Sequence, residues 1–474
     1  MPLQTHISAK PIAPQAMSCA KLAKVVSTTG YLLLASILLS WVALFNGAPL
    51  VFSDTISYST AAFEGEIPGL FSIFYSAFIF PFHLGLTFWP VVFIQAAILA
   101  HLLYLTARAV THGKISHFDM TVIVFALAVF SSLPWVTGEV LTDVFTPVVL
   151  LGFFLLAFAE NDLSRTELIY VGILTTFAIS THLSHIPIAA GLVLLCFGLR
   201  VFVSGKGKRI WRWTARLVLP LLVAVASMIA VNVLNSQSFV LARNSNVFLL
   251  AKWIDEGPAL AYLGDSCPEA GYALCGYLAE LEGKSHDQLK WSGESPFRKI
   301  GTFDELEPEA RAIVRGTFYS HPQEILRKSL IDAGLQFTRF QAGDGLTQEF
   351  ARWVGEHVGR VYGEEVGRPF LVSKQARGDL PVALFRKLHL IGLAIMGALC
   401  LGCLRRRHLL TPEWSRLFLF VFVGIVWSAS VTGALSGPYD RYLARIIWLL
   451  CFVGLIGLLP LARHRPRPFS EPGS

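Results

Sequence analysis

Apolar stretches that are long enough, or nearly long enough, to cross a lipid bilayer recur along this chain. Hydrophobic residues make up 54% of the 474 positions and charged residues 15%, a balance typical of polytopic membrane proteins. The net charge of +7 would suit a nucleic-acid partner, but the basic residues lie in short clusters between the apolar stretches, as in cytoplasmic membrane loops. We therefore predict an all-α polytopic membrane protein with no nucleic-acid partner. Its predicted transmembrane helices, about ten in number, cover residues 31–45, 89–107, 118–133, 144–159, 168–180, 186–203, 217–234, 384–403, 417–431 and 443–461.

The apolar run at residues 69–87 needs a separate interpretation, because Pro81 and Gly85 interrupt it and the next span follows almost directly. If both crossed the bilayer, the basic cluster at 206–216 would lie outside the cytoplasm, against the usual placement of positive charge. We therefore expect 69–87 to be re-entrant or interfacial and buried against protein. Both termini are then cytoplasmic, and the expected location is the inner membrane of a bacterial cell. The short external loops hold one basic residue, Arg441, and six acidic residues: Asp54, Glu64, Glu66, Glu139, Asp143 and Asp440.

Three parts of the chain follow from this layout: an N-terminal membrane module at 1–234, an extracytoplasmic soluble domain at 235–381 and a C-terminal membrane module at 382–474. The middle part is expected to be mainly helical and solvated. Pro322 is expected to begin one of its helices, with Leu326, Leu330, Ala333 and Phe337 on a single apolar face. Cys267 and Cys275 lie in this polar segment, and outside the cytoplasm a disulfide closing the short loop between them is expected.

Four polar clusters share the external side under this topology: residues 53–58, 138–143, 181–185 and 437–442. Carboxylates held at a membrane face without neighbouring Lys or Arg are typical of sites that move protons or hold a polar ligand. The loop at 46–70, with Asp54, Glu64 and Glu66, has this composition. We interpret it as the catalytic loop.

The order of these motifs resembles a known family. The acidic motif after the first span leads into the segment 67–75, IPGLFSIFY, and then into a helix with Gln95; Asp143 follows the next hairpin, and Asp440-Arg441-Tyr442 precedes the last span. This layout resembles the polytopic glycosyltransferases of the GT-C class, which include protein mannosyltransferases, aminoarabinose transferases and arabinosyltransferases. The resemblance covers roughly residues 1–200 and 415–474, and the segment 235–381 matches no soluble domain of that class. It implies a sugar donor carried on polyprenyl phosphate.

The resemblance implies that Asp54 is the general base that takes the proton of the acceptor hydroxyl. That role needs an ionised carboxylate within hydrogen-bond reach of the acceptor, and neighbouring Glu64, Glu66 and Asp143 would raise its basicity by charge repulsion. The alternative for Asp54 is a helix N-cap. Asp143 is likewise expected either to bind metal or acceptor beside Asp54 or to cap the helix that begins after it. Glu139 and Tyr58 are expected substrate contacts in the same cluster.

Arg441, with Arg445 one helical turn below it, is the expected phosphate-binding group. A lipid-phosphate leaving group needs a permanent cation, and the guanidinium of Arg binds phosphate oxygens in pairs. The alternatives are a local ion pair with Asp440 or a snorkelling anchor. Asp440 and Tyr442 are expected to line the same site. His182 and His185 would share one face of a helix, and they would contact substrate, bind metal or serve a structural role.

The favoured interpretation is an inverting membrane glycosyltransferase. It would move a hexosyl or pentosyl group from a polyprenyl-phosphate donor to an extracytoplasmic acceptor, which is a glycan, a lipid or a protein, and membrane lipids would surround it. No cofactor is predicted with certainty, and a divalent cation, Mg²⁺ or Mn²⁺, remains open. The alternatives are a translocator of a lipid-linked or acidic substrate and a polymerase or ligase of lipid-linked glycans.

Overall fold

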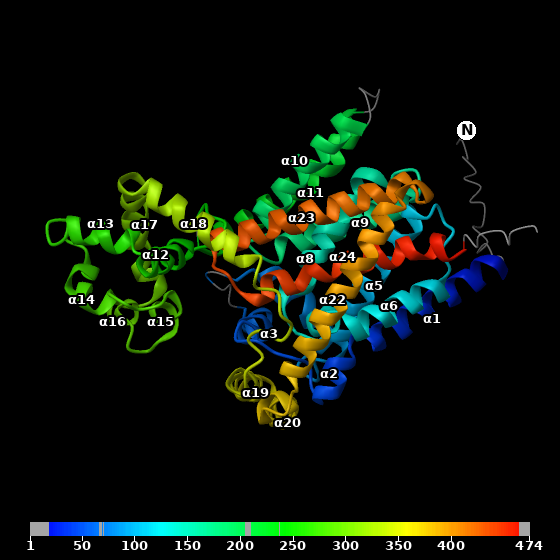
Figure 1. Ribbon diagram of the computed structural model, residues 1–474. Helices are drawn as coiled ribbons and strands as arrows, with labels where there is room; N and C mark the ends of the chain where they lie inside the picture. The colour runs from blue at the N-terminus through cyan, green and yellow to red at the C-terminus, as the bar shows by residue number, and fades with distance from the viewer. Residues whose placement is uncertain (1–18, 66–68, 70, 204–209, 237, 464–474) are drawn as a thin grey trace, which may run out of the picture.

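The computed structural model describes residues 19–65, 69, 71–203, 210–236 and 238–463, and it is all-helical over that part of the chain. Most of the long helices form one bundle, and helices α12–α17 lie beyond one of its ends (Figure 1). Helix α1 begins and α24 ends at the opposite end of the bundle, on the right of the view. A single parallel β-bridge between Leu50 and Glu139 is the only extended pairing among the described residues.

The N-terminal part of the bundle consists of helices of very different length. In chain order they are α1 (Cys19–Leu39), α2 (Trp41–Asn46), α3 (Thr55–Glu64), α4 (Ile73–His83), α5 (Trp89–Val110), α6 (His117–Phe130), α7 (Leu133–Thr137), the 3₁₀ turn η1 (Thr142–Val144), α8 (Phe145–Phe158), α9 (Arg165–Ser180), α10 (His185–Val203) and α11 (Ile210–Ser236). The C-terminal part adds α22 (Val382–Arg405), α23 (Pro412–Leu435) and α24 (Asp440–Arg463).

Five of the described helices are long and apolar enough to cross a membrane, which indicates a membrane protein. They are α5, α11, α22, α23 and the segment Asp440–Leu459 of α24. Five shorter apolar helices accompany them: Val25–Leu39, Ile73–His83, His117–Phe130, Thr142–Phe158 and His185–Arg200. Helix α9, at the predicted span 168–180, falls in neither group. The count of ten spans therefore stays a prediction.

Helix α8 is the centre of the bundle. Nearly every residue from Phe145 to Ala157 is buried, so the helix contacts protein on all sides. By contrast, α11 and α22 expose many large apolar side chains, among them Leu219, Leu222, Leu384 and Ile391, as expected of helices at the periphery of a membrane bundle.

The polar segment between α11 and α22 does not share a single core. Helices α12 (Ser245–Asp255), α13 (Pro258–Ser266), α14 (Leu278–Leu281), α15 (His286–Trp291), α16 (Pro296–Ile300) and α17 (Phe303–Ser320) enclose a small apolar core of their own, which includes Leu250, Leu289, Phe297 and Ile313. Helix α18 (Pro322–Gln336) connects them to the bundle. The later helices α19 (Gln348–Tyr362), α20 (Glu364–Leu371) and α21 (Lys374–Arg377) pack into the core of the bundle through residues such as Val354 and Phe370.

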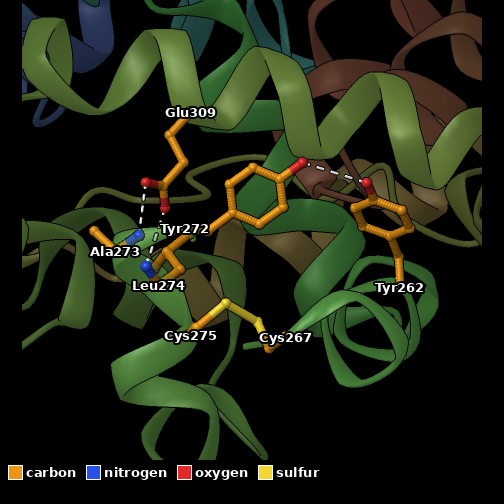
Figure 2. The surroundings of a disulfide bond; sticks show 7 residues. All are labelled: Tyr262, Cys267, Tyr272, Ala273, Leu274, Cys275 and Glu309. Atoms are coloured by element: carbon orange, nitrogen blue, oxygen red, sulfur yellow. Dashed lines mark hydrogen bonds between the residues drawn. A yellow bond between two sulfur atoms is a disulfide. The ribbon is translucent and has the colours of Figure 1, made fainter. Parts of the chain in front are cut away.

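A disulfide bond joins Cys267 and Cys275 in the small domain. Figure 2 shows its surroundings, where the Glu309 carboxylate of α17 accepts hydrogen bonds from the backbone N–H groups of Ala273 and Leu274 (2.8 and 3.0 Å). The disulfide thus closes the loop after α13, and charge-assisted hydrogen bonds attach that loop to α17.

Candidate functional site

The loop that follows α2 is fixed by backbone pairing with the turn after α7. Leu50 donates its N–H to the Gly138 carbonyl and accepts from the Val140 N–H, both at 2.9 Å. The hydroxyl of Thr55 also donates to the Val140 carbonyl at 3.0 Å. Asp54 and Glu139 are thereby held on neighbouring backbone segments that lie far apart in the sequence.

Asp54 forms an ion pair with Arg441 rather than a helix cap. The Arg441 Nη1 lies 3.4 Å from the Asp54 Oδ2. Asp54 occupies the N-cap position of α3, but in the described structure its side chain makes no capping hydrogen bond. Burial raises the pKa of the Asp54 carboxyl above its usual value; Arg441 offsets part of this rise, and the negative charge of Asp143 adds to it. Asp54 is therefore a more basic carboxylate than an exposed Asp.

Asp143 forms a shorter and more deeply buried pair with Arg445, at 2.6 Å between the Asp143 Oδ1 and the Arg445 Nη1. Arg445 is fully buried, and its Nε and Nη2 atoms have no hydrogen-bond partner among the described residues. The alternative role of Asp143 as a cap is not observed: Asp143 lies inside η1, and α8 has no side-chain cap in the described structure.

Arg441 is held from several sides. Its backbone N–H donates to Asp344 at 3.1 Å, and its guanidinium lies 4.3 Å from the centre of the Phe52 ring and 5.1 Å from that of Tyr442. Asp440, proposed as a local partner of Arg441, instead accepts a hydrogen bond from the Gln341 N–H at 2.9 Å. The alternative of a local ion pair with Asp440 is therefore not observed in the described structure, and Arg441 pairs with Asp54 instead.

Glu139 lies beside these pairs with one carboxylate oxygen, Oε1, buried and without a hydrogen-bond partner in the described part of the chain. Burial raises the pKa of Glu139 well above its usual value, and the nearby charge of Asp143 raises it further. Gln95 holds this turn through hydrogen bonds from its Nε2 to the carbonyls of Thr137 and Glu139 (2.8 and 2.6 Å). Glu139 is thus a candidate for a protonated carboxyl that donates a hydrogen bond.

The two histidines have different surroundings. His185 is fully buried and bonds the Thr146 hydroxyl (2.8 Å) and the Ala178 carbonyl (2.7 Å), which is a structural role. His182 precedes α10, so the two residues do not share a helical face as predicted. Burial lowers the pKa of His182 to about 3, and the positive charge of Arg445 contributes. His182 is therefore neutral at physiological pH.

Two of the predicted acids are not part of this cluster. Glu64 is exposed at the far end of α3, roughly 14 Å along the helix from Thr55 at 1.5 Å per residue. Glu66 lies outside the described residues. Tyr58, on the same helix, is buried against the rings of Phe71 and Tyr75. Burial raises the pKa of Tyr58 above its usual value, and the negative charges of Asp54 and Asp143 raise it further.

A small pocket opens beside the Arg441 side chain, and part of its lining was not anticipated from sequence. Its polar lining includes Glu139, Asp143, Arg441 and, from the loop after α18, Gln341 and Asp344. The sequence feature that could have identified this loop is Gly343-Asp344-Gly345, an Asp between two glycines. Both glycines have positive φ (75° and 73°), and a Cβ at Gly345 would collide with the Phe52 ring. This loop can approach the site closely only with glycine on both sides of Asp344.

Divalent cations such as Mg²⁺ are bound by carboxylate and carbonyl oxygens, and two of the carboxylates at this site already have arginine partners. Asp54 and Asp143 are each paired with an arginine, and the described residues contain no group of three or more His, Cys, Asp or Glu side chains arranged to hold a metal ion. No step of the chemistry proposed below passes through a metal.

Comparison with protein-family models, curated proteins and solved structures gave no match for this chain. Function therefore has to be inferred from the chemistry of the pocket itself.

Proposed function

We propose that this protein is an integral membrane glycosyltransferase of the GT-C type, which moves a sugar from a polyprenyl-phosphate donor to an acceptor with inversion at the anomeric carbon. The observation that carries the proposal is the ion pair between Asp54 and Arg441; Arg441 lines a pocket together with Glu139, Asp143 and Asp344. A buried carboxylate and a guanidinium are the two groups that such a transfer needs.

In this proposal Asp54 takes the proton from the acceptor hydroxyl as its oxygen forms a bond to the anomeric carbon of the sugar. The bond between that carbon and the phosphate oxygen breaks, and the phosphate leaves with the electron pair. Arg441 stabilises the charge that builds on this leaving group. Neighbouring carboxylates favour the positive charge that develops on the sugar ring.

The long distance of the Asp54–Arg441 pair suggests how binding and catalysis are coupled. A donor phosphate competes with Asp54 for the Arg441 guanidinium. Once Arg441 binds phosphate, Asp54 loses the charge that stabilises its ionised form, and its basicity increases. Donor binding therefore prepares the base.

Arg445 and Asp143 act as the floor of the site in this scheme. Their close pair sits one turn below Arg441 on α24 and keeps Asp143 ionised as a fixed negative charge. Neutral His182 beside it is suited to accept or donate one hydrogen bond to a sugar hydroxyl.

The membrane arrangement that we propose for this activity has ten spans. The segment 69–87, whose helix α4 has 11 residues and contains Pro81, is re-entrant. Both termini face the cytoplasm, the pocket faces the opposite side, and the protein resides in a bacterial inner membrane. The lopsided distribution of Lys and Arg along the chain supports this orientation.

The test uses purified protein in liposomes with radiolabelled polyprenyl-phosphate mannose and polyprenyl-phosphate arabinose, and a bacterial envelope extract as the acceptor pool. Asp54→Asn keeps the shape of the side chain and removes the base, so label transfer should fall about 100-fold or more. Glu64→Gln is the matched control on the same loop and should leave transfer unchanged. Equal transfer by wild type and Asp54→Asn would refute the proposal, and movement of the donor across the bilayer without a new covalent product would indicate a translocator.

A further inference from the structure

Helix α18 (Pro322–Gln336) exposes a row of large apolar side chains. Leu326 and Leu330 are 60% and 64% exposed, and Ile331, Leu335 and the following Phe337 are each more than 40% exposed. The opposite side of the helix is occupied, since Ile325 and Gln336 are buried. The apolar face predicted from the sequence therefore exists, but Leu326, Leu330 and Phe337 on it face away from the protein.

A patch of this kind is unusual on a surface in contact with water. Single exposed apolar residues need no explanation, but five large ones lie within twelve positions here. At about 100° per residue, Leu326, Leu330 and Phe337 share one face of the helix, and Ile331 and Leu335 lie about a third of a turn further round. Such a face marks contact with a membrane or with another protein.

The neighbour of α18 identifies the membrane as the occupant. Helix α18 packs on α23, one of the five helices able to span a bilayer, and the contact is close because Gly433 has no side chain. A Cβ at Gly433 would lie 2.7 Å from the Asp332 carbonyl oxygen and 2.9 Å from the Ala333 Cα. Figure 1 shows α18 beside the end of α23 nearest the small domain. Leu435 at that end of α23 is itself 60% exposed, so α23 also presents an apolar side chain at this level.

The charges on α18 fit the headgroup region of a bilayer. Residues 322–340 are all described, and the exposed charged ones among them are Arg327 and Arg339, with no exposed Asp or Glu. The acid Asp332 points inward and pairs with Lys252 of α12 at 2.5 Å. Arginines beside an apolar helix face extend toward anionic headgroups while their stems stay in the apolar layer.

We propose that α18 is an interfacial membrane helix, with Leu326, Leu330, Ile331, Leu335 and Phe337 in the lipid and Arg327 and Arg339 at the headgroups of anionic lipids. The small domain is then seated on the bilayer rather than surrounded by water. Helix α18 also reaches the site: the Gln336 side chain bonds both the N–H and the carbonyl of Tyr439 (3.1 and 2.8 Å), two residues before Arg441. The bilayer thus helps to position the loop that carries Arg441, and the proposal holds whatever reaction the pocket performs.

The test places a nitroxide spin label at Leu330→Cys and, separately, at Phe337→Cys, in full-length protein in nanodiscs containing phosphatidylglycerol. Cys196, Cys400, Cys403 and Cys451 are buried, and Cys19 is replaced by Ser so that the label reacts at one position. The control is Glu294→Cys, at an exposed position between α15 and α16.

The collision rate with a water-soluble nickel chelate should be at least about fivefold lower at 330 and 337 than at 294, while collision with oxygen should be higher, as at a lipid-exposed position. Both labelled positions are exposed, so the variants should fold as the wild type does. Nickel accessibility equal to that at 294 would overturn the proposal. Low accessibility to both reagents with dipolar broadening would also overturn it, because it would show a second copy of the chain on this face.

Discussion

Two arginine–aspartate pairs lie one helical turn apart at the start of α24, and their surroundings differ sharply. Arg445 and Asp143 are 2.6 Å apart, with side chains 0% and 7% exposed, whereas Arg441 and Asp54 are 3.4 Å apart, with side chains 19% and 16% exposed beside a pocket. The pocket is lined by Arg441 of the outer pair and by Asp143 of the inner pair. The short, deeply buried pair neutralises charge that the fold has removed from water, whereas the longer and less buried pair can exchange partners. The outer pair is therefore suited to a ligand and the inner pair to structure.

The largest expected effect is on the inner pair. Arg445→Ala leaves the Asp143 carboxylate buried without its counter-charge, and breaking a buried pair in this way costs about 3–5 kcal/mol. Thermal unfolding in detergent should show a large loss of stability. If Arg445→Ala unfolds at the temperature of the wild type, the assignment of this pair to structure is wrong.

Arg441→Ala should give the reverse pattern. The outer pair is partly exposed, so its loss should change stability by about 1 kcal/mol or less. If Arg441 binds the donor phosphate as proposed, its removal should lower transfer from a polyprenyl-phosphate donor about 100- to 1,000-fold. Thermal unfolding and transfer measured on both Arg441→Ala and Arg445→Ala test the contrast between the two pairs directly. Equal losses of stability in the two variants would contradict it.

Gly345→Ala is expected to disturb the outer pair alone. The residue has φ of +73°, and the added methyl would push against Phe52, whose ring lies against the Arg441 guanidinium. Backbone strain of this kind costs about 1–3 kcal/mol. Donor affinity should fall, which would be measured as an increase in KM. The control is Gly113→Ala, because Gly113 also has a positive φ but has open space around it, so the variant introduces strain without a collision.

The smallest expected effect is a shift in pH dependence. Burial raises the pKa of Asp54 above its usual value of 3.8, so its proton is lost, and transfer begins, at a higher pH than for an exposed Asp. Because the folded protein holds this proton more tightly than the unfolded chain, the contribution of Asp54 to stability falls as pH rises through this range. Protonation of Asp54 at acidic pH favours the folded state, so a loss of activity caused by this protonation would not be due to unfolding.

Replacement of Arg441 by Gln should move the acidic limb of the kcat/KM profile to still higher pH, because the charge that lowers the pKa of Asp54 is lost. Arg441→Lys, which keeps the charge, should retain the limb of the wild type. If the acidic limb lies at the same pH in both variants, the group that titrates in this limb is not Asp54.

The sequence predicts the class of the fold and the pocket residues Glu139, Asp143 and Arg441, for identifiable reasons. The apolar runs predict helices, and Asp54, Glu139, Asp143, Arg441 and Arg445 were all recognised as candidates. Their pairing was not predictable: 387 positions separate Asp54 from Arg441, and local reasoning offered Asp440 as an alternative partner. Asp344 was missed because its significance depends on the packing of Gly343 and Gly345 against Val382 and Phe52, which no local pattern reveals.

The middle of the chain illustrates a different limit. The apolar face of α18 was correctly located, but the sequence alone did not show whether that face would turn toward a core or away from it. The division of segment 235–381 between two cores likewise depends on tertiary contacts of α19 and α20.

The location of Gln375 has a consequence for how the protein is made. Its side chain bonds the N–H and carbonyl of Val51 (3.2 and 2.7 Å), and its own N–H donates to Asn46, so a residue of α21 holds the loop after α2 in place. A ribosome has delivered the first acids long before it reaches Gln375, and Arg441 and Arg445 emerge later still. During synthesis Asp54 and Asp143 therefore lack their arginine partners until the last helix, α24, has been made. The pocket is complete only at that point.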